Sequence, residues 1–211
     1  MEIKYYVRTT QERVIDYDLD YTLILNRSHK PVQSFIEALY QIADSDAVLL
    51  EDDLVLCDNF KEEIEKVIAQ YPDYIINFFT EPFRYFTTHK TEFFSYNQCT
   101  YYPKGITKIL ADEMTKLLDK YKTKSWNLVE HRALINLGIV HYVYRPSLVQ
   151  HKDVKSILNN GAQLNRSTIY FKDYLDKLGI TLEDAYKVEN REKLQEILNE
   201  DIKQWEKEMK I

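Results

Sequence analysis

The chain has 211 residues, 45% of them hydrophobic, which suits one substantial domain with a small appendage. Its 4 glycines and 5 prolines are few, which excludes a loop-rich or low-complexity chain. The formal net charge of −6 argues against unspecific nucleic-acid binding, which needs a basic face, but leaves room for a local basic site for a phosphorylated ligand.

The N-terminal residues, MEIKYYVRTT, lack the basic-then-apolar pattern of a secretion signal. No window approaches the ~18 continuous apolar residues of a membrane span. The two cysteines, Cys57 and Cys99, form neither a metal motif nor a disulfide framework. These features predict a cytoplasmic protein with no membrane span.

Apolar periodicity predicts the elements of the first half of the chain. Residues 3–8 and 20–27 have the character of strands, and a polar segment rich in Asp separates them. A proline opens a helix over 31–45, because proline suits the first helical turn and apolar residues follow at helical spacing. A buried strand over 47–50 and a helix over 59–71 follow.

The second half continues the alternation of strands and helices. Strands are predicted over 74–79, 98–102 and 139–147, and helices over 103–121 and 125–137. A glycine directly after the last of these helices ends it. The order predicts a layered α/β domain with a mainly parallel sheet flanked by helices.

The C-terminal part of the chain has a different character. Residues 161–211 show helical spacing and no strand signals, so they are predicted to form a helical extension of a domain that covers residues 1–160. Such an extension either packs back on its own domain or pairs with another subunit, which would make a homo-oligomer.

The stretch AVLLEDDLVL, residues 47 to 56, places three consecutive carboxylates, Glu51, Asp52 and Asp53, behind a short apolar run. The run is typical of a strand buried on both faces, and ligands bind at the carboxyl ends of such strands. Adjacent carboxylates repel one another unless a cation or hydrogen-bond donors lie among them. Mg²⁺ or Mn²⁺ suits such oxygen ligands. Alternatively, Glu51 and Asp52 cap the structure that follows.

A second polar cluster lies in YRPSLVQHKDVKS, residues 144–156. His151 lies in a polar loop, and imidazole with carboxylate is a reasonable Mn²⁺ shell. Lys152, Lys155 and Ser156 follow closely and are suited to donate hydrogen bonds to phosphate oxygens. The alternative for these three residues is an ordinary solvated loop.

The pair LLEDDLVL and, downstream, PSLVQH with a following serine resembles small glycosyltransferases of the GT-A fold. The resemblance is to the broad group that holds lipopolysaccharide-type family 25 enzymes, N-acetylglucosaminyltransferase IV catalytic domains and phage-encoded relatives. It covers roughly residues 1–160. It implies a GT-A-like (Rossmann-like) sheet and transfer of a hexosyl or N-acetylhexosaminyl group from a nucleotide-diphosphate donor, most commonly a UDP-sugar, to an acceptor hydroxyl.

The resemblance assigns roles to the acidic motif and the histidine. Asp53 would coordinate the Mn²⁺ (or Mg²⁺), and His151 would complete the metal shell. Glu51 and Asp52 would hold the donor's ribose or reach the metal through water.

The resemblance also extends to the strand ends and the second cluster. Arg8 and Thr9 match the start of the nucleotide pocket, and Asn26, at the end of the second predicted strand, matches its base and ribose contacts. Lys155 and Ser156 would contact the diphosphate.

A catalytic carboxylate is implied as well, because these enzymes often carry an acid near the start of a helix before the last strand. Glu130, in KSWNLVEHRALINLGI, matches that place and would act as general base on the acceptor hydroxyl. A helix N-terminus would favour its ionised form. Alternatively, Glu130 only stabilises the helix dipole, and Trp126 either stacks on an acceptor sugar or fills the core.

One departure concerns Asp153, because these enzymes commonly have glycine two places after the histidine. Glycine lets the backbone approach a diphosphate closely, whereas aspartate adds bulk and negative charge. Lys152 and Lys155 would offset that charge. The departure concerns the diphosphate contacts and not the fold.

Two other functions fit the same residues. One is a non-catalytic binding module whose C-terminal helices mediate assembly, and the other is a metal-dependent phosphoesterase that activates water. For a transferase, the acceptor would be a glycan, a lipid-linked sugar, a protein or modified DNA, and the acidic net charge argues mildly against DNA.

Overall fold

The computed structural model describes residues 2–10, 13–26, 30–79, 97–118, 126–144 and 147–152, together with residue 120 and isolated positions between 178 and 196. Three positions singled out in the sequence lie outside these ranges, namely Asp153, Lys155 and Ser156. Most of the predicted helical extension over 161–211 also lies outside them.

Strands and helices occur in the predicted order. The strands are β1 (Ile3–Thr9), β2 (Tyr21–Leu25), β3 (Asp46–Glu51), β4 (Leu54–Leu56), β5 (Ile75–Asn77), β6 (Cys99–Tyr102), β7 (His141–Val143) and β8 (Val149–His151). The helices are α1 (Pro31–Gln41), α2 (Phe60–Gln70), α3 (Ile106–Leu118) and α4 (Trp126–Leu137). The residues expected to begin and end helices do so here. A proline begins α1, and Gly138, with φ of +65°, directly follows the last residue of α4.

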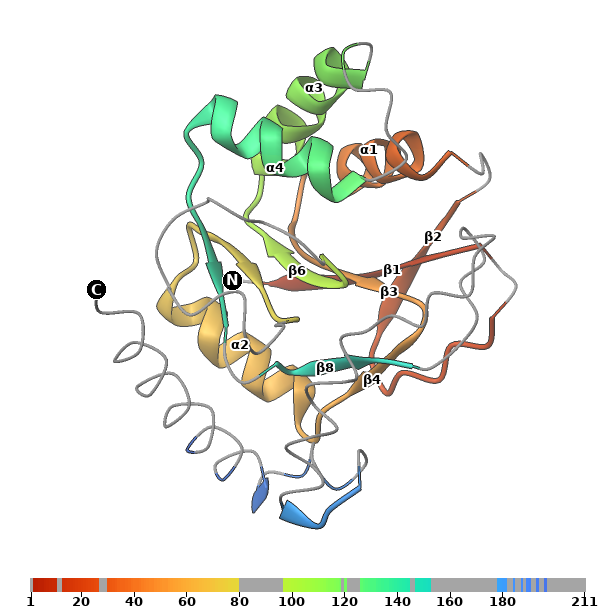
Figure 1. Ribbon diagram of the computed structural model, residues 1–211, viewed down its shortest axis with the longest axis vertical. Helices are drawn as coiled ribbons and strands as arrows, with labels where there is room; N and C mark the ends of the chain where they lie inside the picture. Colours follow the sequence, from red (N-terminus) through yellow and green to blue (C-terminus); the bar gives the residue numbers. More distant parts are fainter. Residues whose placement is uncertain are drawn as a thin grey trace, which may run out of the picture.

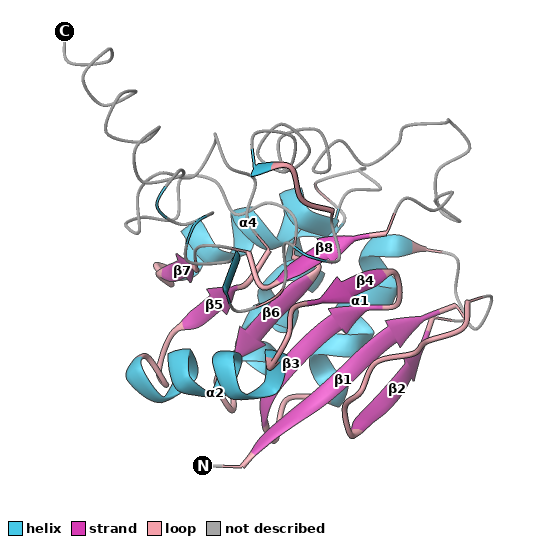
Figure 2. Ribbon diagram, turned by 90° about the horizontal axis from the view of Figure 1, so that it is seen from below, coloured by secondary structure: helices cyan, strands magenta, loops and turns pink. Residues whose placement is uncertain are grey.

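The main sheet has six strands in the order β2-β1-β3-β6-β5-β7. Neighbouring strands run parallel except at β6, which is antiparallel to both β3 and β5. The prediction of an α/β domain with a mostly parallel sheet is therefore confirmed, and the architecture is compatible with a Rossmann-like fold. Figure 2 shows the arrowheads of β1, β2 and β3 pointing the same way.

Helices cover both faces of this sheet. Helices α1, α3 and α4 lie on one face, and α2 lies on the other together with a small sheet of β4 and β8 (Figure 1). Alternation along β3 explains the layering, since Val48 and Leu50 pack on the α2 side while Ala47 and Leu49 pack on the other side. All four are almost fully buried, as expected for a strand between two helical layers.

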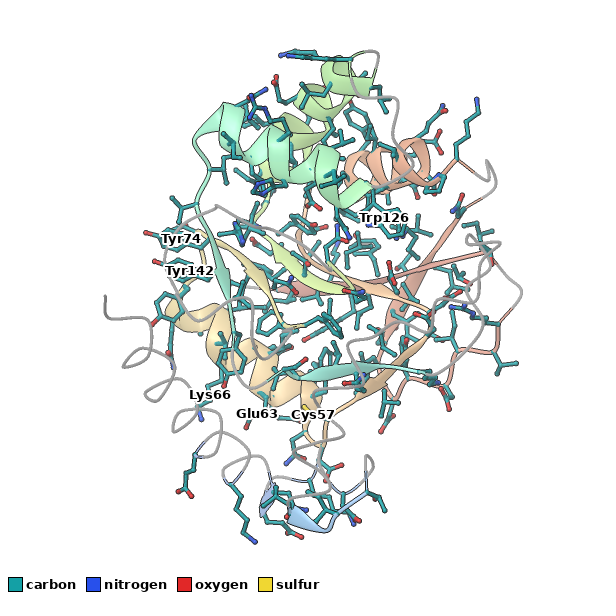
Figure 3. The ribbon with its side chains drawn as sticks, in the orientation of Figure 1. Cys57, Glu63, Lys66, Tyr74, Trp126 and Tyr142 are labelled. Carbon is teal, nitrogen blue, oxygen red and sulfur yellow. The ribbon has the colours of Figure 1, made fainter. Side chains whose placement is uncertain are left out.

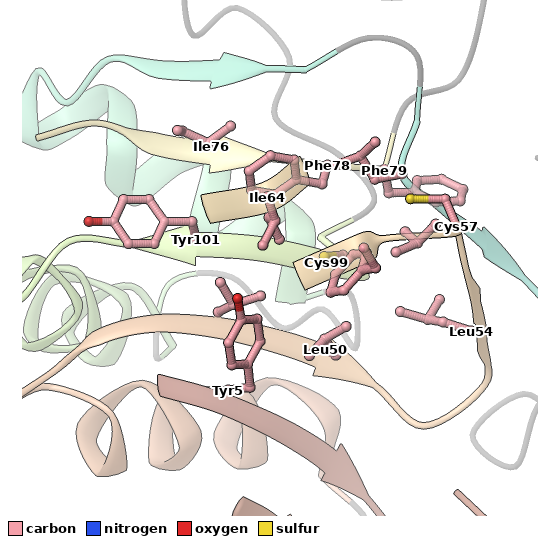
Figure 4. Close-up of a cluster of buried hydrophobic side chains, with 14 of the residues drawn as sticks. Tyr5, Leu50, Leu54, Cys57, Ile64, Ile76, Phe78, Phe79, Cys99 and Tyr101 are labelled. Atoms are coloured by element: carbon pink, nitrogen blue, oxygen red, sulfur yellow. The ribbon is translucent and has the colours of Figure 1, made fainter. Parts of the chain in front are cut away.

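The core on the α2 side also contains both cysteines. Figure 4 shows Cys57 and Cys99 among the side chains of Ile64, Phe78 and Tyr101. Ile64 is fully buried, and burying such a side chain stabilises the fold by about 1.5–3 kcal/mol. The cysteines are free thiols that serve as small apolar residues in this layer.

The small sheet is the main difference from the predicted elements. The pattern predicted a strand over 139–147, within which β7 lies, and it predicted His151 in a polar loop. That second prediction is wrong, because His151 ends β8, which pairs antiparallel with β4. Strands of three residues carry too little periodicity to be recognised. Their pairing also joins segments far apart in the sequence, so it depends on the rest of the fold.

A few positions of the C-terminal part of the chain are described, and the helical extension over 161–211 stays a prediction. Thr181 and Asp184 exchange hydrogen bonds in the manner of a capping box, and positions 184, 189, 190, 193 and 196 are helical. Leu178 and Ile180 pack against the core on the α2 side. Within the parts of the chain that the structure describes, none of the helices has the length and apolarity needed to cross a bilayer.

Candidate functional site

The carboxyl ends of β1, β2 and β3 bring together most of the residues that the sequence singled out. Arg8 is the register partner of Glu51, and the backbone N–H of Asn26 donates to the carbonyl of Thr9 at 2.7 Å. After β1 the chain moves to β2 on one side and later to β3 on the other. The gap between β1 and β3 is therefore a topological switch point, where open α/β sheets bind ligands.

Arg8 is held on three sides. Its guanidinium donates to the Glu51 carboxylate at 2.9 Å and lies over the rings of Trp126 and Phe35, 4.5 and 5.2 Å from their centroids. Figure 3 shows Trp126 between the start of α4 and the sheet. Only 8% of Arg8 is exposed. The charge of Glu51 is therefore directed at Arg8, and the ion pair joins the sheet to α1 and α4.

The other two acids of the motif meet a second arginine, which the sequence did not single out. Nη1 of Arg13 donates to Oδ1 of Asp52 at 2.8 Å and also to Oδ2 of Asp53. Oδ2 of Asp52 accepts a hydrogen bond from the Thr9 hydroxyl at 2.6 Å. Two carboxylates thus converge on one nitrogen atom. Both are almost buried, with 8% of Asp52 and 5% of Asp53 exposed.

Tyr17 fixes the turn that carries the acids. Its hydroxyl donates to the carbonyl of Glu51 at 2.6 Å and accepts from the N–H of Leu54 at 2.8 Å, so it bridges both ends of the turn. Tyr17 and Arg13 come from the irregular, Asp-rich connection between β1 and β2. Neither residue lies in a periodic pattern, and nothing in the sequence marked them as site residues.

The small sheet places the two sequence motifs side by side. Leu54, which follows the acids, is the register partner of His151, and the N–H of Lys152 donates to the carbonyl of Asp53 at 2.7 Å. Lys152 also pairs with Asp16 at 2.9 Å. The structure describes the backbone of His151 but not its side chain, so whether its imidazole contacts the acids stays a prediction.

Glu130 occupies a different environment from the one expected. It is fully buried, and its two carboxylate oxygens accept hydrogen bonds from the Tyr102 hydroxyl, at 2.7 Å, and from Nδ2 of Asn97. Nε1 of Trp126 donates to Oδ1 of Asn97 at 2.7 Å, which links this cluster to Arg8.

The expectation that the helix N-terminus favours the ionised form of Glu130 is wrong. Burial raises the pKa of Glu130 to about 8, although its two hydrogen bonds and the charge of Arg8 act in the opposite direction. Desolvation of a carboxylate in the layer between α4 and the sheet therefore outweighs the two hydrogen bonds and the charge of Arg8, which favour the ionised form.

The acidic turn has the right chemistry for part of a metal site. Two carboxylate oxygens converging on one point suit a hard divalent cation. The cation at that point is the guanidinium of Arg13. Within the described ranges, no three His, Cys, Asp or Glu side chains are grouped to hold a metal ion. Asp52 and Asp53 thus fit as two ligands of a shell that further groups would have to complete.

Several oxygen atoms at this edge have no hydrogen-bond partner in the described part of the chain. Among them are Oγ1 of Thr10, directly after β1, and Oδ1 of Asn26, directly after β2. Both atoms are buried, and buried polar atoms normally find a partner. A polar ligand or water at the ends of β1 and β2 would satisfy them.

Sequence similarity adds nothing to this geometry. Searches against protein-family models, curated proteins and solved structures find no match to the chain, so any function has to be argued from the site itself.

Proposed function

We propose that the protein is a metal-dependent glycosyltransferase with a GT-A-like domain, which moves a sugar from a nucleotide-diphosphate donor to an acceptor hydroxyl. The observation that supports the proposal is the antiparallel pairing of β4 with β8, in which Leu54, directly after Asp53, is the register partner of His151. A UDP-sugar is the preferred donor, on the resemblance of the two motifs to such enzymes.

Different residues of the chain would bind the diphosphate and the ribose of the donor. Asp52 and Asp53 would hold Mn²⁺ or Mg²⁺, which would neutralise the negative charge on the leaving nucleotide diphosphate. The buried oxygens of Thr10 and Asn26 lie at the ends of β1 and β2, where ribose hydroxyls would satisfy them. Diphosphate contacts by Lys155 and Ser156 stay predictions, because both lie outside the described residues.

Glu130 stays the proposed general base, but its burial means that the acceptor reaches it only if neighbouring side chains move. A base has to come within hydrogen-bond distance of the acceptor hydroxyl. In this structure both oxygens of Glu130 bind protein donors instead. The base role therefore requires the acceptor to reach Glu130 through a rearrangement of Asn97 or Trp126. In the arrangement described here, the carboxylate orients these two side chains.

Thermal unfolding with a panel of nucleotide diphosphates and their sugars, each with Mn²⁺ and with EDTA, tests the donor site. A ligand at a hundred times its dissociation constant stabilises by about 2.7 kcal/mol. Each kcal/mol raises the midpoint by about 2–4 °C for a chain of this size. We expect a rise for one nucleotide that disappears with EDTA and in Asp53→Asn.

The matched control is Asp44→Asn, because Asp44 is exposed in the turn after α1 and lies outside the acidic motif. This variant should keep the full rise. A folded protein that responds to none of the nucleotides would contradict the donor site. Product analysis separates the chemistries: a transferase attaches the sugar to an acceptor, whereas a phosphoesterase releases phosphate or nucleoside monophosphate, and a binding module does neither.

A further inference from the structure

We propose that Arg13 is an internal counter-ion that holds the cation position between Asp52 and Asp53, and that a divalent metal ion displaces it. The inference rests on the proposed function, since it concerns the same cation. It goes beyond that function because it assigns a role to a residue of the β1–β2 connection and states what has to move before the metal binds.

The first argument is that the Arg13 guanidinium and the metal ion would bind the same carboxylate oxygens. A single atom, Nη1 of Arg13, donates to Oδ1 of Asp52 and to Oδ2 of Asp53. A hard divalent ion held by Asp52 and Asp53 would use these same carboxylate oxygens, so it would compete with this nitrogen for them. The other Asp52 oxygen is already bonded to Thr9, so Asp52 has no equivalent oxygen to offer in its present orientation. Arg13 and the metal therefore compete for the same oxygen of Asp52.

The second argument is charge. Two almost buried carboxylates repel each other, and leaving them without a cation would be costly. A divalent ion carries twice the charge of the Arg13 guanidinium, so it is attracted more strongly to the carboxylates of Asp52 and Asp53. Arg13 thus keeps the metal-free turn stable, and the exchange favours the more highly charged cation.

The third argument is that Arg13 is able to leave without unfolding the site. The backbone on either side is anchored, by β1 up to Thr9 and by the hydrogen bonds of Tyr17. Between these anchors the chain reaches the surface, since Val14 is 89% exposed and the Arg13 side chain is 17% exposed. Rotation of the Arg13 side chain toward solvent would therefore remove its hydrogen bonds to Oδ1 of Asp52 and Oδ2 of Asp53 while β1 and the Tyr17 hydrogen bonds stay in place.

Calorimetric titration of the full chain with Mn²⁺ tests the competition. In Arg13→Gln the metal no longer has to displace a guanidinium. We therefore expect Mn²⁺ to bind this variant at least about tenfold more tightly than it binds wild type. The matched control is Lys61→Gln, which removes an exposed positive charge on α2, outside the acidic turn. General electrostatics alone should change Mn²⁺ affinity there by less than about threefold.

The outcomes separate this inference from the proposed function. Equal Mn²⁺ affinity in wild type and Arg13→Gln would overturn the displacement of Arg13 and leave the metal site standing. Equal tightening in Arg13→Gln and Lys61→Gln would also overturn it, because only overall charge would then matter. Absence of Mn²⁺ binding in every variant would overturn both the inference and the metal dependence.

A measurement on wild type covers the case in which Arg13→Gln does not fold. In protein labelled with ¹⁵N-arginine, the Nε–Hε signal of Arg13 should shift on titration with Mg²⁺. The signal of Arg8, which is bound to Glu51, should stay in place. Arg13→Lys assigns the signal, because that variant lacks it. Mg²⁺ binding seen by calorimetry with an unchanged Arg13 signal would overturn the proposal.

Discussion

Arg8 and Glu51 lie opposite each other on the parallel strands β1 and β3, and their side chains form an ion pair of 2.9 Å. The pair lies at the carboxyl ends of both strands, beneath the rings of Phe35 and Trp126. Phe35 belongs to α1 and Trp126 to α4. One buried charge pair therefore fixes the relation of the two strands to both helices, at the edge where the ligand is proposed to bind.

Glu51→Gln should destabilise the fold by about 1–3 kcal/mol, because it removes the charge that compensates an almost buried guanidinium. Urea unfolding at neutral pH measures this free energy. The matched control is Glu37→Gln, since Glu37 is exposed on α1, and it should leave the unfolding midpoint nearly unchanged. Equal midpoints for the two variants would show that the Arg8–Glu51 pair contributes nothing.

Tyr17→Phe should loosen the acidic turn. The change leaves the carbonyl of Glu51 and the N–H of Leu54 without the hydroxyl that joins them. We expect a loss of about 1–3 kcal/mol in unfolding free energy and weaker Mn²⁺ binding, measured by urea unfolding and calorimetry. Tyr21→Phe is the control, because its ring packs edge-on against Tyr17 with centroids 6.2 Å apart. Similar Mn²⁺ affinities in both variants would contradict the role of Tyr17.

Much of the fold was predictable because its signals are local. The apolar run of β3 and its acidic end lie next to each other in the sequence, so the position of Asp52 and Asp53 at a strand end follows from periodicity and chain direction. A proline at the start of α1 and Gly138 after α4 mark helix ends in the same local way. The antiparallel direction of β6 carries no such mark, because strand direction depends on partners distant in the sequence.

The site was predictable only in part, for the same reason. Its acids and strand-end residues lie in periodic segments, whereas Arg13 and Tyr17 lie in an irregular connection whose path is set by contacts with the turn itself. The burial of Glu130 was also not predictable. Helical spacing shows which residues share a face of the helix, but it does not show which polar side chains of other elements pack against that face. Asn97 and Tyr102 come from the region before α3, far from Glu130 in the sequence.

Both thiols should resist modification in the native protein. Cys99 is fully buried and Cys57 is 4% exposed, and burial raises the pKa of the Cys99 thiol well above its ordinary value. Labelling with a chromogenic disulfide should therefore be slow in buffer and rapid in guanidinium chloride. Cys57→Ala reports on Cys99 alone. Rapid labelling of native Cys99 would contradict its burial beneath α2.

The buried carboxyl of Glu130 should make stability depend on pH. Its pKa is about 8 in the folded protein against an ordinary 4.5, so its ionisation opposes folding. The neutral form is present in both states below about pH 4.5, and stability is lost as pH rises from there toward about 8. Each unit of pKa difference corresponds to ~1.4 kcal/mol, so the loss amounts to a few kcal/mol.

Glu130→Gln removes this titration and keeps an amide of similar shape. The unfolding free energy of the variant relative to wild type should therefore increase between pH 5 and pH 8, as measured by urea unfolding at each unit of pH. Glu37→Gln, on the surface of α1, should follow wild type across the same range. A constant difference between Glu130→Gln and wild type would show that the carboxyl does not titrate in this window.

The same variant decides between the two roles of Glu130. If Glu130 is the general base, Glu130→Gln should lower kcat by about 10²–10⁴-fold and leave the thermal shift with Mn²⁺ and nucleotide intact. If it only orients Asn97 and Trp126, the amide can still accept one of the two hydrogen bonds, so kcat should fall far less. The pH profile adds a second readout, because a base whose pKa is near 8 gives a rate that rises toward that pH. If Glu130→Gln loses this rise of rate with pH and also shows the large fall in kcat, the proton transfer is assigned to this carboxyl. An unchanged pH profile would leave Glu130 as a positioning residue.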